Sequence, residues 1–107
     1  MNGQIVIVAY RPHTGQEERL LELVKSHVPK LRHLNLATDR TPIVMRAANG
    51  TILEVFEWAS AEAIERAHQH PTVHTMWAEF EAVCNYENPS NLDEFKGLFP
   101  GFAPVEI

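Results

Sequence analysis

A glutamate inside an apolar strand pattern is the residue of this sequence with the clearest capacity for chemistry. Within residues 51–58, Glu54 shares one face of the predicted strand with Ile52 and Phe56. A buried carboxylate is costly unless it is paired, and burial also makes a carboxyl group a stronger base. Two interpretations stay open: Glu54 is a catalytic base, or it makes a structural hydrogen bond or an ion pair with Arg46 of a second copy.

His74 is the second candidate base. It shares one side of a predicted helix with Trp77 and Glu81, one turn apart, so the three could line a pocket between helices and sheet. The alternative is that Trp77 is a core residue, His74 lies at its edge and Glu81 is solvated. The pattern His68, His70, His74 also suggests a metal, but Pro71 interrupts it and no acidic or cysteine ligand lies at a typical offset. We therefore predict no metal site.

The candidate substrate-binding residues are mostly aromatic. They would form the walls of an apolar pocket, and an equally simple interpretation is that they fill the core. They are Tyr10, Trp58, Met76 and Trp77, with Tyr86 placed similarly. Glycines are scattered, so no phosphate-binding loop is predicted.

Composition excludes several classes of partner. The 107 residues carry a net charge of −5, which disfavours nucleic acids and anionic membranes as partners. No stretch approaches the ~20 apolar residues of a membrane helix, and the N-terminal residues do not resemble a signal peptide. The single cysteine, Cys84, is interpreted as a core residue and suits a reducing compartment, so a cytoplasmic location is expected.

The order of predicted elements indicates the fold. Strands are expected at 4–10, 42–48, 51–58 and about 82–87, with helices over 15–34 and from Ser60 to about 83, restarting at Pro71. Asn49-Gly50 predicts a two-residue hairpin turn that places Arg46 opposite Leu53, unless a bulge at Gly50 shifts the register. The order β-α-β-β-α-β is that of an α+β, ferredoxin-like, four-stranded antiparallel sheet with helices on one face.

Both faces of the predicted strands are apolar. Helices can cover only one of them, so we expect a homodimer in which two sheets pack together. Residues 1–90 form the domain in this interpretation, and residues 91–107 form a tail that docks on the domain or on the partner subunit. The tail should be ordered, because it is rich in large apolar side chains.

The chain resembles the dimeric α+β barrel superfamily, and within it the domains related to antibiotic-biosynthesis monooxygenases. The resemblance covers roughly residues 4–87 and rests on the segments NGTILEVFEWAS, EAIERAH and PTVHTMWAEFEAV. It implies a homodimer and a cofactor-independent monooxygenase for a small aromatic or apolar substrate. The alternative is a non-catalytic dimeric module that binds a small ligand or acts in stress response.

The resemblance also bears on haem. The haem-degrading relatives use an Asn on the first strand and a Trp and a His on later helices. The matching positions here are near Val6 and at Ala67 and Trp77, and none has the required residue. No haem or other cofactor is therefore expected.

Overall fold

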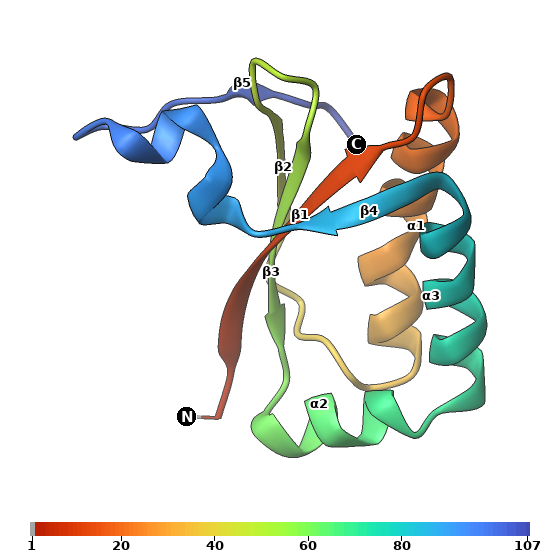
Figure 1. Ribbon diagram of the computed structural model, residues 1–107. Helices are drawn as coiled ribbons and strands as arrows, with labels where there is room; N and C mark the ends of the chain where they lie inside the picture. The colour runs from red at the N-terminus through yellow and green to blue at the C-terminus, as the bar shows by residue number, and fades with distance from the viewer. Residues whose placement is uncertain (1) are drawn as a thin grey trace.

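An antiparallel sheet forms the central layer of the molecule, as seen in a computed structural model that describes residues 2–107 (Figure 1). The five strands lie in the order β4-β1-β3-β2-β5. They are β1 (Gln4–Pro12), β2 (Ile43–Arg46), β3 (Ile52–Trp58), β4 (Cys84–Glu87) and β5 (Ala103–Pro104). The first four have the predicted ferredoxin-like connectivity, and the fifth, from the tail, was not among the predicted strands.

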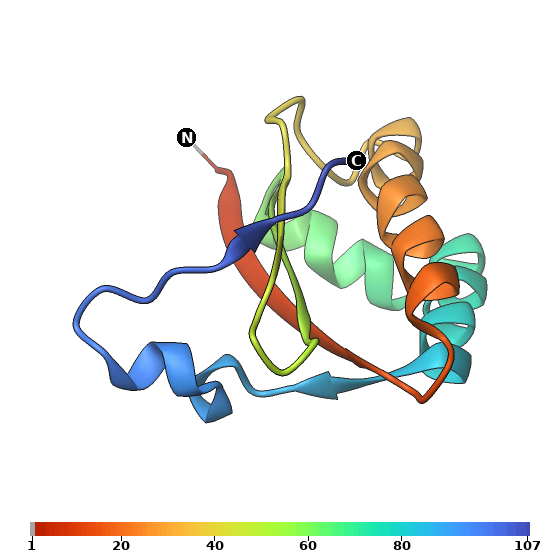
Figure 2. The ribbon, with the colours of Figure 1, turned by 90° about the horizontal axis from the view of Figure 1, so that it is seen from above.

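The helices lie on one side of the sheet. The first part of the tail lies on the other side, and its C-terminal end returns to the first helix (Figure 2). The helices are α1 (Glu17–His33), α2 (Ala61–His68) and α3 (Pro71–Val83), and the tail forms two short 3-10 turns, η1 (Pro89–Asn91) and η2 (Asp93–Lys96). The predicted α+β fold, with helices covering one face, is therefore confirmed. The helix α3 ends at Val83 as predicted, and β4 begins directly after it at Cys84 rather than at about residue 82.

Local signals set the helix boundaries in the predicted way. The Ser60 side chain accepts a hydrogen bond from the Ala63 amide at 3.0 Å and caps α2. The His70 ring accepts from the Thr72 amide at 3.2 Å, and Pro71 begins α3. In α1 the helix continues through Pro29.

The hairpin between β2 and β3 corrects the predicted register. Met45 faces Leu53 and Arg46 faces Ile52, so the two-residue turn is wrong. The Ala47 amide donates to the Thr51 carbonyl at 2.8 Å and closes a loop of residues 48–50, and Gly50 has a φ of 92°. This is the bulge that glycine permits, and it also shortens β2 to residues 43–46.

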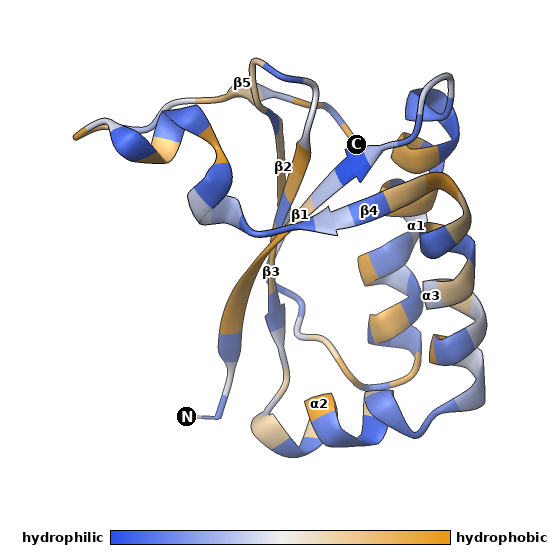
Figure 3. Ribbon diagram, in the orientation of Figure 1, coloured by the Kyte–Doolittle hydropathy of each residue, from blue (hydrophilic) through white to orange (hydrophobic). Residues whose placement is uncertain are grey.

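Two apolar clusters lie on the two sides of the sheet. The main core fills the space between the sheet and the helices, and it includes Leu20, Val28 and Phe80. A small second core lies on the other side, where Leu92 of the tail packs with Leu53. Apolar residues also continue along β1 beyond the tail (Figure 3). The tail thus docks on its own domain and covers part of the face that the helices leave bare.

The aromatic pair of the tail offers a test of this docking. Phe102 is half-buried and its ring lies 5.5 Å from that of Phe95, whereas Phe99 is 89% exposed. Replacing Phe102 with alanine should lower the free energy of unfolding by about 1–2 kcal/mol in urea denaturation. The same change at Phe99 is the control and should cost less than about 0.5 kcal/mol. Equal losses at both positions would contradict the docking.

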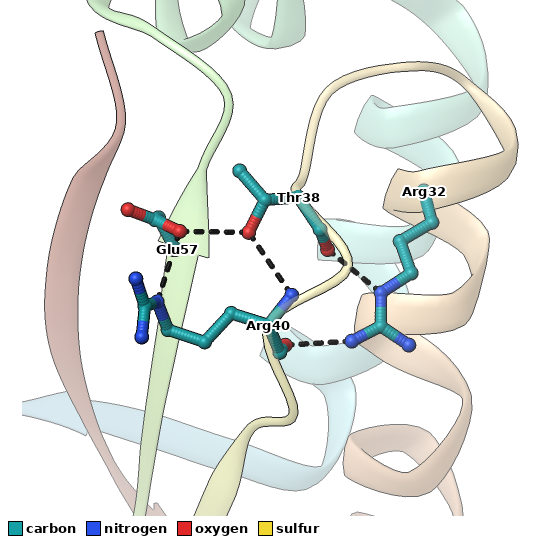
Figure 4. Close-up of polar contacts among 4 residues, drawn as sticks. All are labelled: Arg32, Thr38, Arg40 and Glu57. Carbon is teal, nitrogen blue, oxygen red and sulfur yellow. Dashed lines mark hydrogen bonds and ion pairs between the residues drawn. The ribbon is translucent and has the colours of Figure 1, made fainter. Parts of the chain in front are cut away.

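A polar network holds the connector between α1 and β2 against β3 (Figure 4). The Arg32 guanidinium donates to the carbonyl oxygens of Thr38 and Arg40 at 2.8 and 2.6 Å. The Glu57 carboxylate accepts from the Thr38 hydroxyl at 2.9 Å and from Arg40 at 3.0 Å. These bonds hold the pKa of Glu57 below its ordinary value, with the Thr38 hydroxyl as the largest cause and Arg40 next.

The lowered pKa of Glu57 predicts a pH-dependent contribution to stability. A carboxylate with a depressed pKa in the folded state stabilises the fold above its ordinary value of 4.5, and this effect disappears as pH falls below that value. Wild-type protein should therefore have a higher melting temperature than Glu57→Gln at pH 7, and the difference should shrink by pH 3. A difference of the same size at both pH values would show that the ionised carboxylate is not the stabilising species.

Candidate active site

A cavity of about 260 Å³ lies between the sheet and the helices. It is mostly apolar, and five elements contribute to its wall. The lining residues are Val8 and Tyr10 of β1, His27 of α1, Phe56 and Trp58 of β3, Trp77 and Glu81 of α3, and Tyr86 of β4. Exposed Glu81 and half-exposed Tyr86 mark its mouth.

The structure brings some of the predicted substrate-binding residues together and leaves others apart. Tyr10, Trp58 and Trp77 all line the cavity. Met76 is buried in the main core and does not reach the lining. His74 is exposed and outside the cavity, and its Nε2 is hydrogen-bonded to the backbone carbonyl of His68.

Glu54 is fully buried and forms the centre of a polar network in the core. Its Oε1 accepts a hydrogen bond from the Tyr10 hydroxyl at 2.7 Å and lies 2.8 Å from Nδ1 of His27. Its Oε2 has no hydrogen-bond partner among residues 2–107. Arg46 pairs with Glu17 of its own chain at 2.7 Å, so the intrachain bonds of Glu54 match the structural-hydrogen-bond interpretation rather than an ion pair with Arg46.

The strand register and the helical stripe place these three side chains together. Val8 is opposite Glu54 in the β1–β3 pair and Tyr10 is opposite Ile52, so Tyr10 and Glu54 are diagonal neighbours on one face. His27 comes from the buried stripe of α1, which packs on that face. Its ring meets Phe56 and Phe80 edge-on, with centroids 5.3 and 5.2 Å away. Packing therefore fixes the ring, and the hydrogen bond fixes its rotation.

The two tyrosines of the cavity remain protonated at neutral pH. Burial, with the nearby Glu54 charge as the next cause, raises the pKa of Tyr10 well above its ordinary value. Burial also raises the pKa of Tyr86 to about 12. Both residues therefore offer hydroxyl donors, and no lysine or arginine lines the cavity. Such a site is suited to a neutral aromatic molecule.

Sequence reasoning placed His27 in the core stripe of its helix and missed its contact with Glu54. The available signal was a histidine at a position where every neighbour in the stripe is aliphatic. A buried imidazole needs a hydrogen-bond partner, and Glu54 was the one buried carboxylate that the strand pattern predicted.

Within residues 2–107, no three His, Cys, Asp or Glu side chains are grouped closely enough to hold a metal ion. Within the same range, no helix is long and apolar enough to cross a membrane.

Among solved structures, the chain is similar to SnoaB, a cofactor-independent oxygenase from Streptomyces nogalater. The superposition has a TM-score of 0.59 and covers 81% of this chain and 88% of SnoaB, with 11% sequence identity. No family model and no curated protein matches the sequence. The likeness to SnoaB therefore supports the α+β, ferredoxin-like fold and no finer assignment.

Proposed function

We propose that this protein is a cofactor-independent monooxygenase that oxidises a small aromatic substrate in the cavity between sheet and helices. The observation that carries the proposal is the apolar cavity with the buried network of Glu54, His27 and Tyr10 at its wall. The same fold in a cofactor-independent oxygenase supports it.

The chemistry requires a substrate that loses a proton to give an electron-rich carbanion. Such an anion passes an electron to oxygen directly. A ring CH₂ group then becomes a carbonyl: the carbon loses two hydrogens and gains one oxygen atom, and the second oxygen atom leaves as water with those hydrogens. The O₂ molecule is reduced by the substrate itself, so no further reductant is consumed. The protein supplies a base and a site that excludes water.

The volume of the cavity limits the size of the substrate. An engineered cavity of about 150 Å³ holds benzene, and drug-sized ligands occupy about 300–1,000 Å³. The 260 Å³ here lies between these values, which favours one or two aromatic rings. The side chains of Trp58 and Trp77 would then contact the flat faces or edges of the ligand.

Of the two bases predicted from the sequence, the geometry favours Glu54 and its hydrogen-bonded partners over His74. Glu54 is joined to two cavity-lining side chains, Tyr10 and His27, whereas His74 is exposed and bonded to a backbone carbonyl.

We also propose that two copies associate through the sheet face opposite the helices. Ile7 and Ile43 are about half exposed or more, and both are opposite Val55 in the strand register, so the three form one apolar row across three strands. Exposed apolar surface of this kind marks an interface. The free, buried Cys84 fits a reducing environment, so we place the dimer in the cytoplasm.

A non-catalytic ligand-binding module is the second candidate. The observation that favours it is that Oε1 of Glu54 already has two partners in the core, as a purely structural carboxylate would. Oxygen consumption separates the two candidates.

Oxygen uptake by purified, chelator-dialysed protein tests the proposal. With 6-hydroxy-2-tetralone, a two-ring phenol with an acidic CH₂ group, uptake should exceed the protein-free rate. Relative to its own protein-free rate, three-ring anthrone should be accelerated less. Glu54→Gln should reduce the rate at least tenfold. The matched control is Glu57→Gln, the same change on the opposite face of β3, and it should keep the wild-type rate. No uptake across a panel of one- and two-ring substrates would contradict the proposal.

A further inference from the structure

We propose that His27, through Nε2, accepts the proton of a phenolic hydroxyl group bound in the cavity, and that Glu54 is the positioning residue that fixes this tautomer. The inference deepens the proposed function and rests on it for the place of the ligand. It assigns a further feature to the one- or two-ring substrate, a neutral phenolic hydroxyl group in addition to the acidic CH₂ group, from the groups that line the site.

The hydrogen bond to Glu54 determines which ring nitrogen is free. An ionised carboxylate only accepts hydrogen bonds, so Nδ1 of His27, 2.8 Å from Oε1, carries the hydrogen. In its neutral form the ring then has its lone pair on Nε2, and the hydrogen bond that His27 makes among residues 2–107 is through Nδ1. Since the ring lines the cavity, Nε2 is the nitrogen that remains for a ligand. Tyr10 strengthens this arrangement by donating to the same Oε1 at 2.7 Å.

The charges around the cavity select the ligand. Glu54 lies behind the wall and Glu81 lies at the mouth, while no lysine or arginine lines the site. Carboxylates and phosphates are therefore repelled. A free Nε2 acceptor requires a donor such as a hydroxyl group, and the rings of Trp58, Trp77 and Phe56 favour an aromatic body. These conditions together describe a phenol that enters in its neutral form.

The proton transfer leaves the net charge of the site unchanged. The phenol O–H bond breaks, its electron pair stays on oxygen, and the proton forms an N–H bond at Nε2. In the arrangement that we propose, an ionised Glu54 carries the one charge of the network before transfer. Afterwards the phenolate, the imidazolium and Glu54 alternate in sign, so each negative group is adjacent to a positive one. Tyr10 and Tyr86, the other titratable groups that face this centre along with Glu81, keep their protons.

The probe for this step is 4-nitrophenol, whose phenolate absorbs visible light. At pH 6 with saturating protein, the ratio of phenolate to phenol should be at least tenfold higher for bound than for free probe. His27→Gln should remove this enrichment while the probe still binds. In Glu54→Gln the side-chain amide oxygen can still accept a hydrogen bond from Nδ1 of His27, but it carries no charge. This variant should therefore give a phenolate-to-phenol ratio between those of the wild type and His27→Gln. Glu57→Gln is the control and should behave as the wild type.

A second measurement needs no variant and therefore does not depend on folding of the mutants. Quenching of tryptophan fluorescence reports binding, because both tryptophans line the cavity. Nitrobenzene, which lacks the hydroxyl group, should bind at least tenfold more weakly than 4-nitrophenol, and 4-nitrobenzoate should not bind measurably. Equal binding of nitrobenzene and 4-nitrophenol, or an unchanged phenolate ratio in His27→Gln, would overturn the inference.

The two proposals fail separately. Phenolate enrichment without oxygen uptake by any substrate would retain the His27 site and reject the monooxygenase. Oxygen uptake with no enrichment, and with full activity in His27→Gln, would retain the monooxygenase and reject the role of His27.

Discussion

Replacing Glu54 with alanine will lower the free energy of unfolding by about 2–6 kcal/mol, because it leaves two buried hydrogen-bonding groups without a partner, at a cost of about 1–3 kcal/mol each. The substitution leaves the Tyr10 hydroxyl and Nδ1 of His27 without their acceptor in a core where both side chains are almost fully buried. Urea denaturation at pH 7 measures the loss, at a fixed protein concentration.

The matched control is alanine at Glu57, three residues along the same strand. Glu57 makes its bonds at the surface, with exposed Arg40 and part-buried Thr38, and surface pairs contribute less than about 1 kcal/mol. A loss at Glu54 no larger than at Glu57 would mean that the buried network does not form in solution.

We expect glutamate in place of Ile7 to convert the proposed dimer to a monomer. Ile7 lies in the row with Val55 and Ile43, so a charge there would be buried against the same row of the second copy. Sedimentation at micromolar concentration should give a dimer for the wild type and a monomer for Ile7→Glu. Obligate interfaces bury above ~2,000 Å², so the wild-type dimer should not dissociate at micromolar protein concentration.

The control for this experiment is Ala78→Glu, which adds the same charge at an exposed position of α3. It should remain dimeric. A wild type that sediments as a monomer, or an Ile7→Glu variant that stays dimeric, would place the apolar row outside any interface between copies.

The alternation of residues in 51–58 was enough to predict the geometry of β3. Because side chains of a strand point alternately to the two faces, Glu54 had to share the face of Ile52 and Phe56, and it is buried there. The caps at Ser60 and His70 were similarly local, since each depends on amide groups two or three residues away.

Features that depend on distant residues could not be predicted in this way. His27 and Glu54 are 27 positions apart, and their contact depends on how α1 crosses the sheet, which the helical pattern does not specify. Asn-Gly favours the two-residue turn, but the positive φ of Gly50 also fits the bulge of a three-residue loop, and the local sequence did not decide between the two. The pairing of β5 with β2 could likewise not be predicted, because it depends on the path of the tail from β4 to the other edge of the sheet.

Isotope labelling with ¹⁸O₂ tests the central claim most directly. During turnover of 6-hydroxy-2-tetralone by chelator-dialysed protein in unlabelled water, mass spectrometry should find one ¹⁸O atom in the new carbonyl group of the product and the other in water. The extraction must be rapid, because carbonyl oxygen exchanges with solvent. Product that carries only ¹⁶O after rapid quenching, together with ¹⁸O recovered as hydrogen peroxide, would show that oxygen is not inserted and would contradict the monooxygenase account.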